Sequence, residues 1–297
     1  MTSYSRNGLR SFTRQHDSLV GIDSDGCVFD SMEIKQKRCF HGEIIDQWGL
    51  QEIAPHVRQV AEFVNLYSTW RGSNRFVALL KMFELLEEWD VIQSSGVHLP
   101  DLSALRDYVN SGLPLSNDTL KAEAEKSGHE ELHRVYAWSC AVNDRVERVV
   151  KEVPLFRGVR ETLDKMKAQS DLIVVSQTPT EALAREWEQH GLREYVHLLA
   201  GQELGTKNDH LQWATTDRYP LHRVLLIGDA PGDRKAAQAV NTFFYPINPG
   251  HEEASWKRLH DEAYDRFITG EFDAAYQEAL IKEFEVLLPE IPPWQSL

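Results

Sequence analysis

Six polar residues of types that can do phosphate and metal chemistry each follow an apolar run or open a helical stretch. They are Asp23, Asp25, Ser176, Lys207, Asp229 and Asp233. Carboxylate oxygens are the ligands that Mg²⁺ prefers, and hydroxyl and ammonium groups can hold phosphate oxygens. The set therefore predicts phosphoryl transfer at a Mg²⁺ site.

Three continuous apolar runs should position most of these residues. The runs cover 19–22, 172–175 and 224–227, and their lack of polar alternation indicates strands buried on both faces. Acids or a serine follow each run directly or after one glycine. Ligands of open α/β sheets bind outside the carboxyl ends of the strands. We therefore expect the six residues to converge at one edge of a sheet.

The rest of the chain divides into a sheet-forming part and a helical part. After residue 154, strand and helix patterns alternate, which is typical of a parallel sheet. Between residues 31 and 150, apolar residues recur at helical spacing. We predict a three-layer, doubly wound, mostly parallel α/β core from residues 1–31 and 151–297, including a helical C-terminal extension. Residues 32–150 should form an inserted all-helical domain.

Composition narrows the possible partners. The chain of 297 residues has 32 basic and 46 acidic residues, and a net charge of -14 argues against binding to nucleic acid. No apolar run reaches the ~18 residues that a membrane helix needs. Three scattered cysteines do not form a disulfide framework, so we expect a reducing, cytoplasmic compartment. The residues leave the oligomeric state open.

The order of the motifs resembles the haloacid dehalogenase (HAD) superfamily of phosphatases and phosphotransferases. Asp23-Ser24-Asp25-Gly26 matches its first motif, Ser176 the second, Lys207 the third and GDAPGD at 228–233 the fourth. The resemblance implies a HAD-like Rossmannoid core with a cap domain inserted after the first motif, where the helical stretch lies.

The resemblance also implies a role for each residue. Asp23 would be the nucleophile that forms an aspartyl-phosphate, and Asp25 the general acid and then the general base. Ser176 and Lys207 would bind the substrate phosphate. The ligands of Mg²⁺ would be Asp23, the backbone carbonyl of Asp25, Asp229 and, directly or through another ligand, Asp233. An aspartate at position 25 favours phosphate esters over the substrates of dehalogenases.

We therefore expect a Mg²⁺-dependent phosphatase that hydrolyses a small phosphorylated metabolite. A phosphomutase or phosphotransferase of the same family would use the same residues, and a non-catalytic ligand-binding relative is a third alternative. The identity of the substrate stays open, because the geometry of the cap domain would determine it.

Three features have a second interpretation. Arg71 and Arg75 lie in a break between two helices and could contact an anionic substrate, or could form surface salt bridges. Residues 129–133 spell HExxH, a zinc-protease motif, but Ser127 and Glu130 match a helix capping box, which we prefer. Ser176 could instead cap the helix expected after Pro179.

Overall fold

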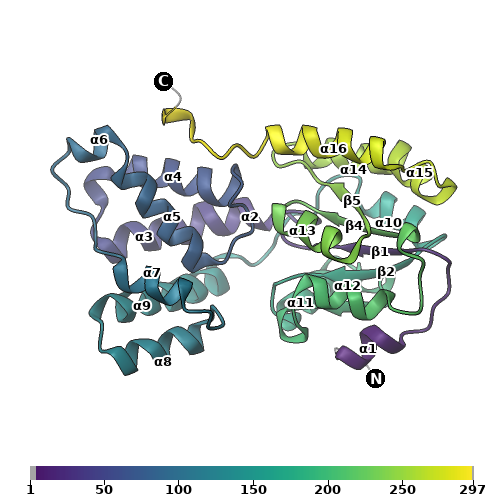
Figure 1. Cartoon of the computed structure of the whole chain (residues 1–297), viewed down its shortest axis with the longest axis horizontal. Coiled ribbons are helices and arrows are strands. Elements are labelled where there is room, and N and C mark those ends of the chain that lie inside the picture. The colour runs from purple at the N-terminus through teal and green to yellow at the C-terminus, as the bar shows by residue number, and fades with distance from the viewer. Residues whose placement is uncertain (1–4, 296–297) are drawn as a thin grey trace. The chain divides into compact units, whose positions relative to one another are not determined.

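The computed structural model describes residues 5–295, which form two compact units (Figure 1). The sheet unit comprises the described residues of Met1–Ser31 and Val153–Leu288, and the helical unit those of Met32–Glu152 and Pro289–Leu297. The sequence assigned the segment after residue 288 to the core. In the structure this segment groups with the helical unit, because the ring of Trp294 stacks on Trp89 with their centroids 4.6 Å apart.

A five-stranded sheet forms the centre of the sheet unit. Its strands are all parallel and lie in the order β3-β2-β1-β4-β5. Their bounds are β1 Leu19–Ile22, β2 Asp171–Val175, β3 Leu198–Ala200, β4 Val224–Gly228 and β5 Phe243–Pro246. Every residue of β1, β2 and β4 is buried, as continuous apolar runs predict for a sheet covered on both faces.

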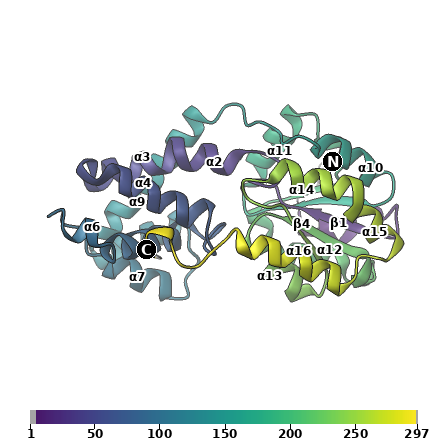
Figure 2. The same ribbon diagram turned by 90° about the horizontal axis from the view of Figure 1, so that it is seen from above.

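Helices cover both faces of this sheet, which confirms the predicted three-layer α/β class. Figure 2 shows α12, α13 and α16 on one side, and α10, α11 and α14 on the other. The helices of this unit are α1 Arg6–Ser11, α10 Val159–Lys167, α11 Thr180–Gln189, α12 Lys207–Thr215, α13 Pro231–Val240, α14 Glu252–Arg258, α15 Tyr264–Thr269 and α16 Ala274–Val286. A π-helical turn, Leu259–Ala263, joins α14 to α15.

Gly21 in the middle of β1 lets α12 pack closely on the sheet. A Cβ atom at this position would lie 3.2 Å from side-chain atoms of Leu211 on α12, Leu226 on β4 and Val175 on β2. Such a distance is tighter than ordinary van der Waals contact, so a side chain would push these neighbours apart. The glycine therefore helps to hold the first residue of α12 near the end of β1.

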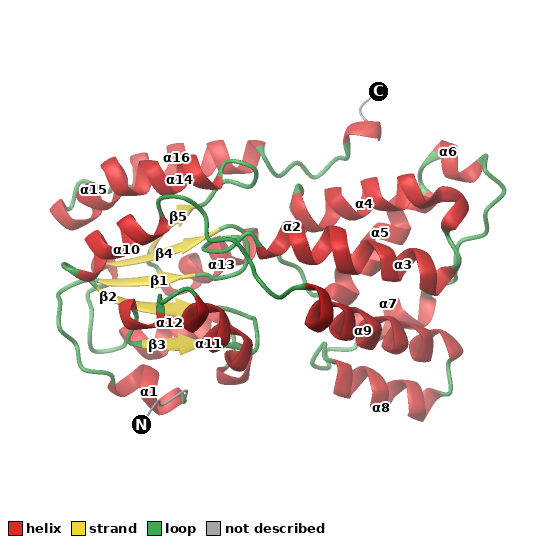
Figure 3. Cartoon of the chain, turned by 180° about the vertical axis from the view of Figure 1, so that it is seen from behind, coloured by secondary structure: helices red, strands yellow, loops and turns green. Residues whose placement is uncertain are grey.

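Every regular element that the structure describes between residues 32 and 152 is a helix (Figure 3). They are α2 Ser31–Lys35, α3 His41–Trp48, α4 Ala54–Leu66, α5 Arg75–Glu87, α6 Asp90–Gln93, α7 Ser103–Asn110, α8 Asn117–Ser127 and α9 Glu130–Val149, with a π-helical turn at Gln36–Phe40 and a short 3₁₀ turn at Gln51–Ile53. Their apolar faces enclose a core that includes Val60, Phe83 and Trp138. No helix within residues 5–295 is long and apolar enough to cross a membrane.

Candidate active site

The strand register brings the sequence-predicted residues to one edge of the sheet. Ile22 of β1 is level with Val174 of β2 and with Ile227 of β4. Because the three strands run in parallel, the residues that follow them emerge at the same edge. Asp23, Ser176 and Asp229 are therefore brought to one edge, as the sequence predicted.

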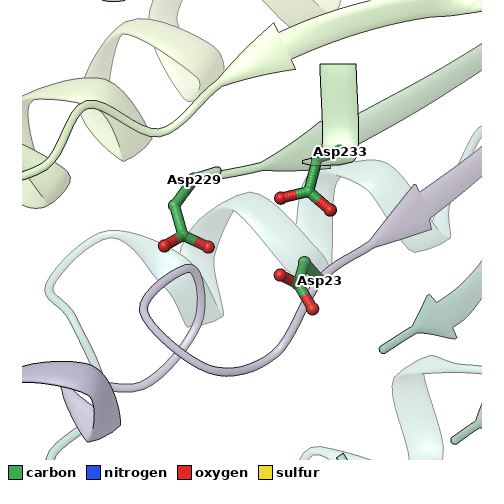
Figure 4. A group of neighbouring side chains, drawn as sticks. All are labelled: Asp23, Asp229 and Asp233. Carbon is green, nitrogen blue, oxygen red and sulfur yellow. The ribbon is translucent and has the colours of Figure 1, made fainter. Parts of the chain in front are cut away.

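Asp23, Asp229 and Asp233 form a buried carboxylate cluster (Figure 4). One oxygen from each carboxylate lies within 4.8 Å of the other two, and the residues are 5%, 2% and 0% exposed. Like charges at this distance repel one another strongly when they are out of water. The cluster therefore needs positive charge for all three groups to be ionised.

Lys207 supplies part of that charge. Its Nζ lies 2.7 Å from Oδ2 of Asp23 and 2.5 Å from Oδ1 of Asp233. Lys207 is the first residue of α12, whose N-terminus is fixed by reciprocal hydrogen bonds between Thr206 and Asp209. The position of the ammonium is therefore set by the start of a capped helix.

Burial and charge act in opposite directions on the pKa values of this pair. Burial raises the pKa of Asp23 well above its usual value, and the Lys207 ammonium opposes that rise. Burial would lower the pKa of Lys207, but the carboxylates of Asp23 and Asp233 outweigh it and raise the pKa above its usual value. Three buried carboxylates facing one ammonium leave an excess of negative charge, which fits a divalent cation with oxygen ligands.

A tight turn after β1 places Asp25 next to Asp23. The carbonyl of Ser24 accepts hydrogen bonds from the backbone N–H groups of Cys27, Val28 and Phe29. Gly26, with φ of 75°, adopts the left-handed conformation that glycine tolerates best. The turn is also held by a hydrogen bond of 3.0 Å from the Trp187 indole to the Ser24 hydroxyl.

Two hydroxyl groups contact the carboxyl of Asp25, and the sequence singled out neither of them. Ser31 Oγ donates to Asp25 Oδ1 at 2.5 Å, and Thr178 Oγ1 donates to Asp25 Oδ2 at 2.8 Å. Thr178 stands two residues after Ser176, which is the only hint in the sequence that it lies at this edge. The hydrogen bond itself joins positions 153 residues apart, which no local pattern predicts.

Gly228 allows Asp233 to lie against the end of β4. A Cβ at Gly228 would come within 2.4 Å of Cγ of Asp233, closer than real side chains approach. Asp233 Oδ2 accepts a hydrogen bond of 3.0 Å from the backbone N–H of Ala230, just before α13. Asp233 thus caps α13 with one oxygen and contacts Lys207 with the other.

Ser176 does not cap the next helix, so that interpretation is wrong. The residue that precedes α11 is Pro179, three positions further on. The Ser176 hydroxyl instead accepts a hydrogen bond of 3.2 Å from the backbone N–H of Thr178, and the residue is buried. Its own N–H donates to the carbonyl of Ala200 at the end of β3. These contacts hold the Ser176 side chain within the loop after β2.

Arg71 and Arg75 both contact groups inside the helical unit. Arg71 is 3% exposed, and its Nη1 donates to the carbonyl of Leu66. Nη1 of Arg75 donates to the hydroxyl of Ser139 at 2.9 Å and to Oδ1 of Asn143 at 2.8 Å. Contact of either arginine with a substrate stays a prediction.

The HExxH sequence lies at a helix start, but without the expected capping box. Ser127 is the last residue of α8, and Gly128 ends that helix with φ of 70°. His129 precedes α9, and its side chain makes no capping hydrogen bond. Among residues 5–295, the group of three metal-binding side chains lies at the sheet edge and includes neither histidine.

Comparison with known families identifies one match. A model of the haloacid dehalogenase-like hydrolases matches residues 101–246, which is just under half of the chain. The matched range includes Ser176, Lys207, Asp229 and Asp233, and begins after the turn that carries Asp25. None of the curated proteins compared with the sequence matches it.

Several solved structures resemble this chain at low sequence identity. A protein described as a haloacid dehalogenase-like hydrolase from Bacteroides fragilis is 13% identical, with a TM-score of 0.49 over 81% of this chain and 93% of that one. A HAD-superfamily hydrolase of subfamily IA from Geobacter sulfurreducens is 16% identical, with a TM-score of 0.40 over 79% and 90%. A protein described as a predicted phosphatase from Clostridium acetobutylicum is 19% identical, with a TM-score of 0.42 over 78% and 85%.

Proposed function

Because a model of the haloacid dehalogenase-like hydrolases matches just under half of this chain, we propose that the chain belongs to this superfamily and is a Mg²⁺-dependent phosphatase that forms an aspartyl-phosphate on Asp23. The observation that carries the proposal is the buried cluster of Asp23, Asp229 and Asp233 with the ammonium of Lys207 at its side. The substrate would be a small phosphorylated metabolite, since a site at the edge of an α/β sheet suits a small ligand.

The carboxylate cluster suits Mg²⁺ by its chemistry and by its charge. Asp23, Asp229 and Asp233 would hold the ion, because each offers an oxygen in the same small space. When bound, Mg²⁺ supplies positive charge that lets an anionic carboxylate approach an anionic phosphate. Lys207 and the hydroxyl of Ser176 would bind phosphate oxygens.

The first half-reaction would transfer the phosphoryl group to the protein. An oxygen of the Asp23 carboxylate attacks phosphorus, and the bond from phosphorus to the leaving oxygen breaks. Asp25 gives its proton to that oxygen, so the product leaves as a neutral alcohol. The turn after β1 supports these separate roles, because it holds the carboxyl groups of Asp23 and Asp25 at the same edge of the sheet, with one residue between them.

The second half-reaction would return both residues to their initial state. A water molecule attacks the phosphorus of the acyl-phosphate and gives a proton to Asp25, which is now a carboxylate. The bond from phosphorus to Asp23 breaks, and inorganic phosphate leaves. Asp23 is again a carboxylate and Asp25 again carries a proton.

A phosphatase assay with 4-nitrophenyl phosphate tests this proposal. We expect wild-type activity with Mg²⁺, loss of activity in EDTA, and a loss of at least about a thousandfold in Asp23→Asn, because the amide cannot attack phosphorus. Asp17→Asn is the matched control, since the Asp17 side chain is 96% exposed and pairs with Arg14. Acid quenching of the wild type during turnover should trap phosphate on the peptide that contains Asp23.

Unchanged activity in Asp23→Asn would refute the nucleophilic role. A wild type that binds phosphate esters without hydrolysing them would favour a non-catalytic relative. Transfer of the phosphoryl group to an added sugar in preference to water would instead favour a phosphomutase or phosphotransferase.

A further inference from the structure

Thr178 forms hydrogen bonds with two residues of the proposed reaction, Asp25 and Ser176. Its Oγ1 donates a hydrogen bond of 2.8 Å to Oδ2 of Asp25, and its backbone N–H donates one of 3.2 Å to the hydroxyl of Ser176. We propose that Thr178 is a positioning residue that orients the carboxyl of Asp25 for proton transfer to the leaving group. This inference rests on the proposed phosphatase function.

The backbone around Thr178 is fixed by the end of β3. Its carbonyl accepts a hydrogen bond of 3.1 Å from the N–H of Gln202. Gly201 approaches so closely that a Cβ there would lie 2.7 Å from the carbonyl oxygen of Thr178. Threonine is also restricted at χ1 by its branched Cβ. The hydroxyl that contacts Asp25 therefore comes from a rigid part of the loop.

Asp25 needs such a contact because the torsion that turns its carboxyl group is soft. Rotation about the terminal bond of an aspartate has a broad, roughly two-fold preference, so hydrogen bonds determine the orientation. Ser31 contacts Oδ1 and Thr178 contacts Oδ2, so each oxygen has one hydroxyl partner. The two contacts together resist rotation of the carboxyl plane.

A hydroxyl suits both protonation states that the reaction requires of Asp25. The Thr178 hydroxyl can donate to the carboxylate that acts as a base, and it can donate to the unprotonated oxygen of the carboxyl that acts as an acid. The contact can therefore persist through both half-reactions. A valine of nearly the same shape would keep the packing and lose this contact in both states.

The hydrogen bond between Thr178 and Ser176 couples the position of the Asp25 carboxyl to the position of the bound phosphate. Ser176 is the residue proposed to bind a phosphate oxygen, and Thr178 donates to its hydroxyl through the backbone. The leaving oxygen is bonded to the same phosphorus, so its distance from Asp25 depends on both contacts. Misplacing a reacting group by about 1 Å can cost about a hundredfold in rate.

The test compares two aryl phosphates of similar size that differ in their need for a proton. Phenolate is a poor leaving group that depends on general acid catalysis, whereas 4-nitrophenolate leaves with little help. For Thr178→Val, we expect kcat/KM to fall by about 10- to 100-fold with phenyl phosphate and by less than about threefold with 4-nitrophenyl phosphate. Thr178→Ser, which retains the hydroxyl, should recover most of the activity on phenyl phosphate.

Thr180→Val is the matched control. Thr180 lies two residues further along the chain, as the first residue of α11, and its hydroxyl donates to Oε2 of Glu203 at 2.7 Å instead of to Asp25. We expect Thr180→Val to keep the wild-type rates with both substrates. If Thr178→Val does not fold, Thr178→Ala removes the same hydroxyl without adding volume.

Equal losses with the two aryl phosphates would overturn the positioning role, because a general defect of the site does not depend on the leaving group. Equal behaviour of Thr178→Val and Thr180→Val would also overturn it, while the phosphatase function would stand. A wild type that is inactive on both substrates would overturn the proposed function and this inference with it.

Discussion

At the scale of single residues, the site depends on charged side chains that are buried, where burial makes their charge unfavourable. Asp23 is buried against two other carboxylates, and burial raises its pKa. Lys207 compensates by contacting Asp23 and Asp233 with one ammonium group. The spacing of these residues in the sequence predicted that they gather at one edge of the sheet, because a parallel sheet brings the residues that follow its strands together. It did not predict that Lys207 and Asp233 are in direct contact.

His210 should make the stability of the protein depend on pH. The ring is fully buried on α12, and burial lowers the pKa of His210 to about 4. Below about pH 6.5 the unfolded chain takes up a proton that the folded protein does not, so stability is lost as the pH falls from about 6.5 to 4. Between pH 7 and pH 5 this loss amounts to about 2 kcal/mol.

Urea unfolding of His210→Leu at both pH values measures this contribution. The variant should lose less stability than the wild type between pH 7 and pH 5, by about 2 kcal/mol. His222→Leu is the control, because His222 is exposed on the surface of the same unit. Parallel pH dependence in the wild type and in His210→Leu would contradict the expected titration.

At the scale of elements, the site consists of the ends of strands and the starts of helices. The turn after β1 brings Asp23 and Asp25, α12 begins at Lys207, and the loop between β4 and α13 brings Asp229 and Asp233. The sequence predicted that Lys207 opens a helical stretch, and α12 begins at that residue. It was wrong about the capping box at Ser127, since local spacing did not reveal that α8 continues through that residue.

Gly228→Ala should damage the metal site through a single methyl group. Its Cβ would lie 2.4 Å from Cγ of Asp233 and would push that side chain away from the cluster. We expect Mg²⁺ affinity, measured by isothermal titration, to fall at least about tenfold, and stability to fall by about 2 kcal/mol. Unaltered Mg²⁺ affinity in this variant would argue against Asp233 as part of the metal site.

Gly232→Ala provides the control for this steric argument. Gly232 lies in the same loop-to-helix segment, and nothing lies within 4 Å of a Cβ at that position. The substitution adds the same methyl group without a clash, so we expect stability equal to or above that of the wild type.

At the scale of the whole molecule, the chain passes between the two units three times. It does so after Ser31, after Glu152 and again after Leu288. The first two passages were predicted from the change of pattern between strands and helices. The third was missed, because residues 289–295 form too short a segment to have a periodicity of their own. Tertiary contacts, such as that of Trp294 with Trp89, assign this segment to the helical unit.

Trp294→Ala should loosen the C-terminal segment and the helices beneath it. The Trp294 ring also meets Phe63 of α4 with centroids 5.4 Å apart, and Gln295 donates to Glu88 at 3.1 Å. Loss of this partly buried ring should cost the helical unit about 2 kcal/mol. Hydrogen exchange measures the effect locally: we expect faster exchange in α4 and unchanged exchange in the sheet.

Val286→Ala is the control for the same region of the chain. Val286 ends α16 just before the C-terminal segment, and 80% of it is exposed. Its truncation should leave exchange in both units as in the wild type. Slow exchange of α4 in Trp294→Ala would mean that the segment does not contribute to the stability of the helical unit.

The sequence by itself determined the class of fold and the chemical types present at the site. Continuous apolar strands can only be buried in a sheet covered on both faces, and a parallel sheet collects the residues after its strands at one edge. The tertiary structure alone decided which side chains touch. The contact of Thr178 with Asp25, the bridge from Lys207 to Asp233 and the stacking of Trp294 on Trp89 all join residues far apart in the chain. Such contacts depend on the packing of whole elements, which no local pattern specifies.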